Sequence, residues 1–265
     1  MKKTLTIAGS DCSGGAGIQA DIKTMTVHNV YGMSVITALT AQNTLGVTGI
    51  VDVDKNFVKA QLEAVFTDIA PDSIKVGMVS SSDIIKTIAK TLDIHRAKNI
   101  VVDPVMVATS GALLISEQAK ESLVKELFPL ASIITPNLME AEELSGIKIE
   151  NEEKMIEAAK HLSKLTPGAI LIKGGHFRGG ANDLLYTQGE LMWFKHFKVK
   201  NENTHGTGCT LSSAIASNLA NGYGLVESVR LAKEFITKLI EDKLDLGRGR
   251  GPLNHMALIS LDKES

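Results

Sequence analysis

Residues 203–210 are the part of this chain best suited to bind a negatively charged group. They read NTHGTGCT, and small and aliphatic residues follow at helical spacing as far as Leu219. Glycines let the backbone turn tightly and approach a ligand, and a helix that begins here directs unpaired N–H groups and its positive dipole end toward an anion. The pattern predicts a phosphate site formed by Gly206, Thr207 and Gly208. A purely structural glycine turn is the alternative interpretation.

Cys209 adds a reactive group to the same stretch. The dipole of a helix favours the thiolate form of a cysteine in its first turn, so Cys209 could accept a proton beside a bound phosphate. A buried, unreactive thiol is the alternative. The only other cysteine in the chain is Cys12. An isolated pair is a poor basis for a disulfide framework, which favours a reducing compartment.

A second group of candidates near the N-terminus could bind a polar substrate. The apolar run 5–8 leads into residues 9–17, GSDCSGGAG, whose glycine spacing does not match a dinucleotide fingerprint. Asp11 and Asp21 could accept hydrogen bonds from a substrate, and Ala16 leaves room for a flat ring. A turn residue and an exposed helix residue are the alternatives for the two aspartates.

Gln42 is a candidate for reading the edge of that ring. It follows the β-rich run 33–40, so it lies near a strand end. An amide donates and accepts hydrogen bonds at once, which suits the adjacent donor and acceptor of an aminopyrimidine. A capping or loop-bracing glutamine is the alternative.

Polar residues that follow three later strand patterns could hold a metal–phosphate complex. They are Asp103, Asn137 with Glu140, and Lys173. Ligands of open parallel sheets bind beyond the carboxyl ends of the strands. Carboxylate and amide oxygens suit Mg²⁺, usually through water, and the lysine could reach a nucleotide phosphate. For Asp103, a plain turn before proline is the alternative.

The elements that must position these residues alternate between strands and helices. Strand patterns cover residues 5–8, 33–40, 47–53, 73–78, 99–102, 132–135 and 169–172, with a hairpin in 183–197. Helical patterns begin near residue 18 and cover 56–69, 82–92, 117–127, 152–165, 207–219 and 225–240. This alternation predicts an α/β fold with a mainly parallel sheet. Nothing in the sequence resembles a linker or a repeat, so we expect one domain over residues 1–265.

Composition limits the classes of partner. The 265 residues are 44% hydrophobic and 22% charged, which is ordinary for a globular protein with a large core. The net charge of −2 and the dispersed basic residues argue against nucleic acid or an anionic membrane as a partner, so we expect a small molecule. No apolar run is long enough for a membrane span or a signal peptide, which predicts a cytoplasmic protein.

Six ordered motifs make the chain resemble the hydroxymethylpyrimidine/phosphomethylpyrimidine kinases of thiamine biosynthesis, within the ribokinase-like superfamily. The motifs are GSD and SGGAGIQAD in 9–21, TAQNT in 40–44, DPVM in 103–106, TPN in 135–137, KGGH in 173–176 and HGTGCT in 205–210. The resemblance spans nearly the whole chain. It implies a three-layer α/β/α fold, ATP with Mg²⁺, usually a homodimer, and phosphorylation of the hydroxymethyl group and then of the monophosphate.

The resemblance also suggests how the candidate residues share the work. The substrate ring would lie between Ala16, Val107 and Met78, with Gln42 at its polar edge and its hydroxyl toward Cys209. Mg²⁺ would be held mostly through water by Glu140, with Asn137 and Asp103 nearby. Lys173 and Thr204 would contact the nucleotide, and Asp11 and Asp21 would support the substrate pocket.

The sequence departs from the family at two places, and two other functions compete. Cys12 stands where relatives commonly have proline or serine, and Ala108-Thr109 replaces a lysine-containing flap, so no flap lysine is assigned. Pyridoxal kinases of the same branch bind a similar ring, but Gln42 and the absence of a flap cysteine favour the pyrimidine. A vitamin-binding sensor without turnover is the alternative from a different class, against which the glycine motif and Cys209 argue.

Overall fold

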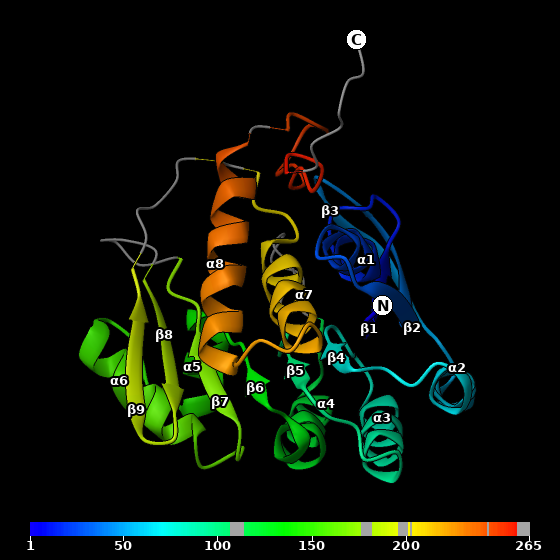
Figure 1. Cartoon of the computed structure of the whole chain (residues 1–265), viewed down its shortest axis with the longest axis horizontal. Helices are drawn as coiled ribbons and strands as arrows, with labels where there is room; N and C mark the ends of the chain where they lie inside the picture. The colour runs from blue at the N-terminus through cyan, green and yellow to red at the C-terminus, as the bar shows by residue number, and fades with distance from the viewer. Residues whose placement is uncertain (107–113, 176–181, 196–200, 202, 243, 259–265) are drawn as a thin grey trace.

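A nine-stranded sheet runs through the middle of the molecule (Figure 1). The structure is a computed structural model that describes residues 1–106, 114–175, 182–195, 201, 203–242 and 244–258. The strands in chain order are β1 (Lys3–Asp11), β2 (Tyr31–Asn43), β3 (Gly46–Asp52), β4 (Ser73–Val76), β5 (Ile100–Val102), β6 (Ile133–Ile134), β7 (Ala169–Ile172), β8 (Asp183–Thr187) and β9 (Glu190–Phe194).

The sheet is parallel at its centre and antiparallel at both edges. Its spatial order is β3-β2-β1-β4-β5-β6-β7-β8-β9. All pairs from β2 to β7 are parallel, whereas β3 pairs antiparallel with β2, and β8 and β9 continue antiparallel from β7. The carboxyl ends of six neighbouring parallel strands therefore lie along one edge, where open α/β sheets bind their ligands.

Helices cover both faces of this sheet and make three layers. They are α1 (Gly17–Val27), α2 (Lys55–Asp68), α3 (Ser82–Ile94), α4 (Glu117–Ser122), α5 (Leu138–Ser145), α6 (Glu152–Leu162), α7 (Thr207–Ala220) and α8 (Leu225–Glu241). The first, seventh and eighth pack on one face, and α2 to α6 pack on the other (Figure 1). The predicted α/β fold with a mainly parallel sheet is confirmed, and with it the three-layer arrangement.

One predicted helix differs from its expected form. The pattern over 117–127 begins as α4, but it continues as a π-helix over Leu123–Leu127 and a 3₁₀ turn over Phe128–Leu130. Pro129 cannot donate a backbone hydrogen bond, so the regular ladder cannot run past it. None of these described helices is long and apolar enough to cross a membrane.

Strand β4 carries a charged residue into the interior because its side chains alternate between the two faces. Ile74 and Val76 join the apolar core under α2 and α3, and Lys75 points to the opposite face. Its Nζ donates to both carboxylate oxygens of Asp21 on α1, at 2.8 and 3.0 Å, and both side chains are fully buried. Ser213 of α7 donates to the same carboxylate at 2.6 Å.

These contacts tie the sheet, α1 and α7 together through one buried charge pair. Burial disfavours the charged form of Lys75, but Asp21, Cys209 and Asp103 together outweigh that effect, and the pKa of the lysine is raised. A pair of this kind is costly to break, because the remaining partner becomes an uncompensated buried charge.

We predict that Lys75→Met lowers the free energy of unfolding by about 3–5 kcal/mol, because Asp21 loses its counter-charge. Urea denaturation at pH 7 measures the change. The matched control is Lys55→Met, which breaks the exposed Lys55–Asp83 pair and should change the unfolding midpoint far less. Equal effects of the two substitutions would contradict the role given to the buried pair.

Candidate functional site

A cavity of about 840 Å³ opens at the carboxyl ends of the parallel strands. Each of the six parallel strands contributes a residue that lies at or just after the strand's carboxyl end. Thirteen of the residues singled out from the sequence line it: Asp11, Ala16, Gln42, Met78, Asp103, Asn137, Glu140, Lys173, Thr204, Gly206, Thr207, Gly208 and Cys209. The tertiary structure therefore brings segments that are up to about two hundred residues apart to one site.

The start of α7 forms the part of the cavity wall suited to an anion. Gly206 is the N-cap and has a left-handed φ of 82°. A Cβ atom there would lie 1.8 Å from the carbonyl oxygen of Gly15, so only glycine fits. The Thr207 N–H already donates to the Thr204 carbonyl at 3.3 Å. The Thr207 N–H is thus partly used by the turn itself. Gly208 and Cys209 follow in the first turn of α7, where backbone N–H groups have no partner within the helix.

Cys209 lies partly exposed on the cavity wall, in the first turn of α7. Burial raises the pKa of the Cys209 thiol, and Asp21 and Asp103 act in the same direction. The positive charge of Lys75 and the Gly17 N–H oppose that rise without cancelling it. The prediction that the thiolate is favoured is therefore wrong for the free protein, because the loss of hydration outweighs the nearby positive charges.

Asp103 and Lys173 form an ion pair beneath the glycines of α7. Lys173 Nζ donates to Asp103 Oδ1 at 2.7 Å, and Thr135 donates to the same oxygen at 3.0 Å. Burial opposes the charge on Asp103, but Lys173 and Lys75 hold the pKa of this carboxyl below its ordinary value. A Cβ atom on Gly208 would lie 3.4 Å from Asp103 Oδ2 and 3.5 Å from Lys173 Nζ. The pair therefore lies directly against the open helix start.

Asn137 and Glu140 form a reciprocal cap at the start of α5. The Asn137 side chain accepts from the Glu140 N–H at 2.9 Å, and the Glu140 carboxylate accepts from the Asn137 N–H at 2.7 Å. Burial and the neighbouring Asp103 raise the pKa of Glu140 to about 7, against the attraction of Lys173. The expected pairing on one helix face is present, but both residues also serve the fold as a capping box.

The donor set at Glu140 fits Mg²⁺ only as a water-rich site. Within the described residues, no group of three or more His, Cys, Asp or Glu side chains could hold a metal ion. Glu140 and Asp103 nevertheless line the cavity with buried carboxylates. Mg²⁺ in nucleotide sites commonly keeps several waters and uses one or two carboxylates together with phosphate oxygens. The residues present fit that arrangement.

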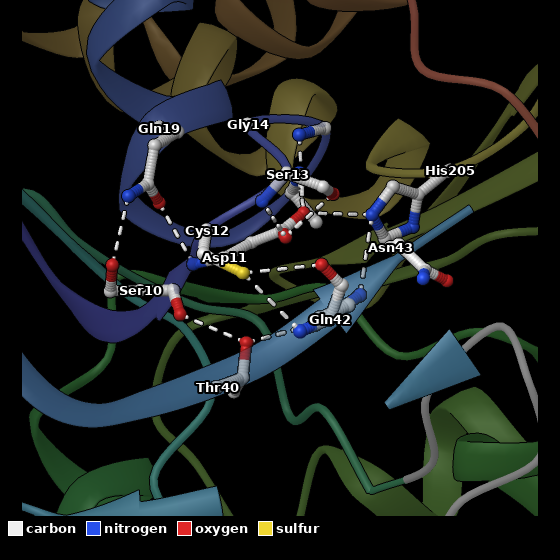
Figure 2. Close-up of polar contacts among 12 residues, drawn as sticks. Ser10, Asp11, Cys12, Ser13, Gly14, Gln19, Thr40, Gln42, Asn43 and His205 are labelled. Atoms are coloured by element: carbon white, nitrogen blue, oxygen red, sulfur yellow. Dashed lines mark hydrogen bonds and ion pairs between the residues drawn. The ribbon is translucent and has the colours of Figure 1, made fainter. Parts of the chain in front are cut away.

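Asp11 is the centre of a tightly bonded loop (Figure 2). Its carboxylate accepts from the Ser13 N–H and hydroxyl, at 2.9 and 2.8 Å, and from the N–H groups of Gly15 and Ala16, at 3.1 and 2.8 Å. His205 Nε2 lies 2.8 Å from Oδ2 of the same carboxylate. Burial raises the pKa of Asp11, but His205, Ser13 and Ala16 together lower it to about 2.

Asp11 therefore organises the loop and has little capacity left for a substrate. Asp21 is a clearer correction: it is fully buried in the ion pair with Lys75, also accepts from Thr6 at 2.5 Å, and does not line the cavity. Its position on the inner face of α1 directs it toward the sheet. Both aspartates therefore stabilise the fold around the pocket, and their hydrogen bonds are already taken by the protein itself.

Two predictions fall on residues that the structure does not describe. Val107 and the departure at Ala108-Thr109 both lie outside the described residues, as does His176 of the KGGH motif. The predicted enclosure of the ring by Val107 stays a prediction. Met78 and Ala16, the other two residues expected around the ring, both line the cavity.

Two residues that contact the predicted site residues were not assigned from the sequence. His205 is buried and contacts both Asp11 and Gln42, and its place in the HGTGCT motif was the available signal. Lys75 lies in an apolar strand pattern, where a lone lysine was the available signal. In both cases the partner is far away in the sequence, so only the fold reveals the contact.

Comparison with known families gives a match over most of the chain. The family described as phosphomethylpyrimidine kinase matches residues 11–254. A bifunctional thiamine biosynthesis protein, ThiED, from Geobacter sulfurreducens is 51% identical over 253 residues, which cover 95% of this chain and 52% of that protein. The chain thus spans about half of that bifunctional relative. A hydroxymethylpyrimidine/phosphomethylpyrimidine kinase from Rhizobium meliloti is 48% identical over 255 residues, which cover 95% of this chain and 96% of that kinase.

Two kinds of solved structure are similar. A phosphomethylpyrimidine kinase from Clostridium difficile has a TM-score of 0.81 at 50% identity, covering 89% of this chain and 98% of that one. A pyridoxal kinase from Staphylococcus aureus, solved with AMP-PCP and pyridoxal, has a TM-score of 0.89 at 34% identity, covering 98% and 96%. Both support the three-layer fold.

We predict that Asp11→Asn lowers the free energy of unfolding by about 2 kcal/mol at pH 7, because the lowered pKa of Asp11 measures how strongly the folded state favours its charge. For a carboxylate with a lowered folded pKa, this stabilisation is present above the unfolded value near 4 and is lost as the pH falls toward 2. Urea denaturation from pH 7 to pH 3 should show the difference between variant and wild type shrinking. A difference that grows on acidification would contradict the assignment.

We also predict that Cys209 reacts slowly with iodoacetamide at neutral pH, because burial raises its pKa and the thiolate is the reacting form. A Cys12→Ser background leaves Cys209 as the only cysteine. Mass spectrometry should show the alkylation rate still rising beyond the ordinary thiol pKa of about 8.5. A plateau below pH 8 would instead support a favoured thiolate.

Proposed function

Because the chain belongs to the phosphomethylpyrimidine kinase family, we propose a specific division of work among the residues of its cavity. The function is the ATP-dependent phosphorylation of 4-amino-5-hydroxymethyl-2-methylpyrimidine and then of its monophosphate to the diphosphate, in thiamine biosynthesis. The observation that carries the assignment of the site is the open start of α7, with Gly208 and Cys209 facing a cavity that also contains Gln42.

The pyrimidine binds at the β1–β2 side of the cavity. Gln42 reads its polar edge, and Ala16 and Met78 contact the ring, with Val107 as a further expected contact. The Met78 sulfur would lie 3.2 Å from a Cβ atom on Gly9, so Met78 packs closely against the glycine of β1 at this wall. In this position the hydroxymethyl group faces Cys209.

The transferred phosphoryl group is stabilised by the helix start and by Lys173. Phosphoryl transfer requires little covalent work from the protein, so positioning and charge neutralisation dominate. The N–H groups of Gly206, Gly208 and Cys209, with a smaller part for Thr207, direct partial positive charge at the developing negative charge. Lys173 keeps its positive charge next to these groups because Asp103 pairs with it.

The nucleotide phosphates lie between Lys173 and Thr204, with Asn137 and Asp103 nearby. Mg²⁺ bound with ATP would supply charge neutralisation between the phosphates, held through water by Glu140. The Glu140 carboxyl, whose pKa is raised to about 7, is a buried group that gains from a nearby cation. The capping contact with Asn137 fixes its orientation.

Cys209 accepts the hydroxyl proton late in the transfer. Its raised pKa means that the free protein holds mainly the neutral thiol. Lys75 and the α7 dipole stabilise the fraction that is ionised. The rate should therefore rise with pH above 7, toward the pKa of the thiol.

Pyridoxal is a second candidate substrate. The likeness to the pyridoxal kinase from Staphylococcus aureus, at a TM-score of 0.89 over nearly the whole chain, favours it. The ring would use the same Ala16 and Met78 contacts but would leave the amide of Gln42 without a matching amino group.

We further infer a cytoplasmic protein that folds as one kinase domain over residues 1–265 and forms a homodimer. Exposed apolar side chains on the β2–β3 edge support a second copy there. Leu39 is 52% exposed, Val51 67% and Ile50 39%. Apolar side chains gathered in this way on a sheet edge commonly mark an interface.

We predict that Cys209→Ala lowers turnover by about 10²–10⁴-fold, because the hydroxyl proton loses its acceptor. The measurement is ADP release with Mg-ATP and, in parallel, hydroxymethylpyrimidine, its monophosphate and pyridoxal. Calorimetric titration of the pyrimidine into the variant should show that binding is retained, which separates lost chemistry from lost folding.

The outcomes discriminate between the candidate functions. Turnover on both pyrimidines by the wild type supports the kinase, and loss of turnover on the hydroxymethyl substrate in the variant supports the role of Cys209 as acceptor of the hydroxyl proton. A preference for pyridoxal would overturn the argument from Gln42. Binding without ADP formation by the wild type would instead favour a sensor.

A further inference from the structure

The Asp11 carboxylate determines where the proton of His205 lies. Five hydrogen-bond contacts converge on this carboxylate, four of them from N–H or O–H groups of residues 13–16. Such a carboxylate is ionised and can only accept hydrogen bonds. The fifth contact, 2.8 Å from His205 Nε2 to Asp11 Oδ2, therefore requires a proton on Nε2. His205 is a donor at this atom.

This proton conflicts with one orientation of the Gln42 amide. Gln42 Nε2 is placed 3.3 Å from His205 Nε2, so that two N–H groups would face each other (Figure 2). The two ends of a glutamine amide have the same shape, and their identity has to be decided from the hydrogen bonds around them. With the amide reversed, the Gln42 oxygen faces the His205 Nε2–H and shares it with Asp11 as the longer branch of a bifurcated bond, so the conflict disappears.

Thr40 leads independently to the same orientation. Its hydroxyl lies 2.9 Å from the Ser10 carbonyl oxygen and 3.2 Å from the Gln42 amide atom on the side away from His205. A hydroxyl has one proton to donate, and the Ser10 carbonyl can only accept. If the Gln42 nitrogen faces Thr40, it donates to the hydroxyl oxygen, and the hydroxyl proton goes to Ser10. Every donor then has an acceptor.

The backbone of Gln42 is also held. Cys12 Sγ lies 3.2 Å from the backbone carbonyl oxygen of Gln42 and 3.4 Å from its backbone nitrogen (Figure 2). The thiol can donate to the first and accept from the second. Cys12 therefore fixes the strand position from which the side chain reaches into the cavity.

We propose that His205 and Thr40 are positioning residues that lock the Gln42 amide with its oxygen toward His205 and its nitrogen toward Thr40, and so set the order of acceptor and donor that the substrate must match. The proposal rests on the proposed role of Gln42 as the residue that reads the ring. One lone pair of the oxygen and one N–H of the nitrogen remain free for a ligand.

The fixed order of acceptor and donor on the Gln42 amide matches the pyrimidine in only one orientation of the ring. His205 directly precedes Gly206, the N-cap of α7, so the amide oxygen that faces His205 lies toward the helix start. The amino group of the substrate is on the carbon next to the hydroxymethyl-bearing carbon, and it meets this oxygen when the hydroxyl faces Cys209. The ring nitrogen beyond the amino group then accepts from the amide N–H. The reversed amide would place two donors opposite each other.

The test compares two substrates that differ only in this order. The second is the 4-oxo analogue, in which the amino group is replaced by an oxygen acceptor and the adjacent ring nitrogen carries a proton. We expect wild type to prefer the amino compound by about 100-fold in kcat/KM, since a matched bidentate pair discriminates by roughly 5- to 150-fold. Thr40→Val keeps the shape of the side chain but removes the hydroxyl, and it should reduce the preference to about tenfold through KM.

Matched variants keep the outcome interpretable. Thr40→Ser retains the hydroxyl and should retain the preference. His205→Met removes the donor and should reduce the preference, and His205→Gln, which supplies an N–H, should restore part of it. A change in kcat/KM that is equal for both substrates, with an unchanged preference in Thr40→Val and His205→Met, would overturn the proposal, because a purely structural role acts on both substrates alike.

Gln42→Met separates this proposal from the function on which it rests. If Gln42→Met abolishes the preference but the Thr40 and His205 variants keep it, Gln42 reads the ring without being locked, and the proposal fails. If Gln42→Met leaves the preference unchanged, the assigned role of Gln42 itself is wrong.

Discussion

The close approach of two loops is the constraint on which the rest of the site depends. Gly206 lies so near Gly15 that a Cβ atom would lie 1.8 Å from its carbonyl oxygen, and a Cβ atom on Gly15 would lie 2.3 Å from the ring of His205. Glycine at both positions lets the loop after β1 and the loop before α7 touch. Asp11 and His205 then join them with a buried hydrogen bond. The loop after β1 and the start of α7 thereby become one unit.

Buried charges fix that unit to the sheet. Lys75 and Asp21 link β4 to α1, and Ser213 extends the contact to α7. Asp103 and Lys173 form a second pair directly beneath Gly208. The two lysines place positive charge near the proposed phosphate site, and the two aspartates prevent that charge from being lost through burial. The same pairs that stabilise the fold therefore also set the electrostatic field in which Cys209 titrates.

This arrangement explains why ionisation of Cys209 is disfavoured and why the Gln42 amide is held in one orientation. Loss of hydration favours the neutral thiol, which suits the proposed role of Cys209 as a proton acceptor that acts late in phosphoryl transfer. The role proposed for Gln42 sets the opposite requirement, because a residue that reads a ring has to present its donor and acceptor in a constant order. Thr40 and His205 supply that order, and Cys12 holds the backbone of Gln42.

The sequence alone determined the fold class, and most of the residues singled out from it line the cavity. Alternating strand and helix patterns predict a parallel sheet, and in such a sheet the residues after successive strands meet at one edge, which is why Gln42, Asp103, Asn137 and Lys173 could be grouped. Local patterns also identify the helix start at Gly206, because glycine and helical spacing are short-range signals.

Only the tertiary structure decided which polar groups are already occupied. Asp21 is indistinguishable in the sequence from a ligand-binding aspartate, and its pairing with Lys75, fifty-four residues away, removes it from the cavity. The state of Cys209 depends on burial and on charges brought from three other elements, so its position at a helix start predicted the wrong direction for its pKa. Hydrogen bonding and hydration depend on neighbours in space, and those neighbours are set by the packed fold.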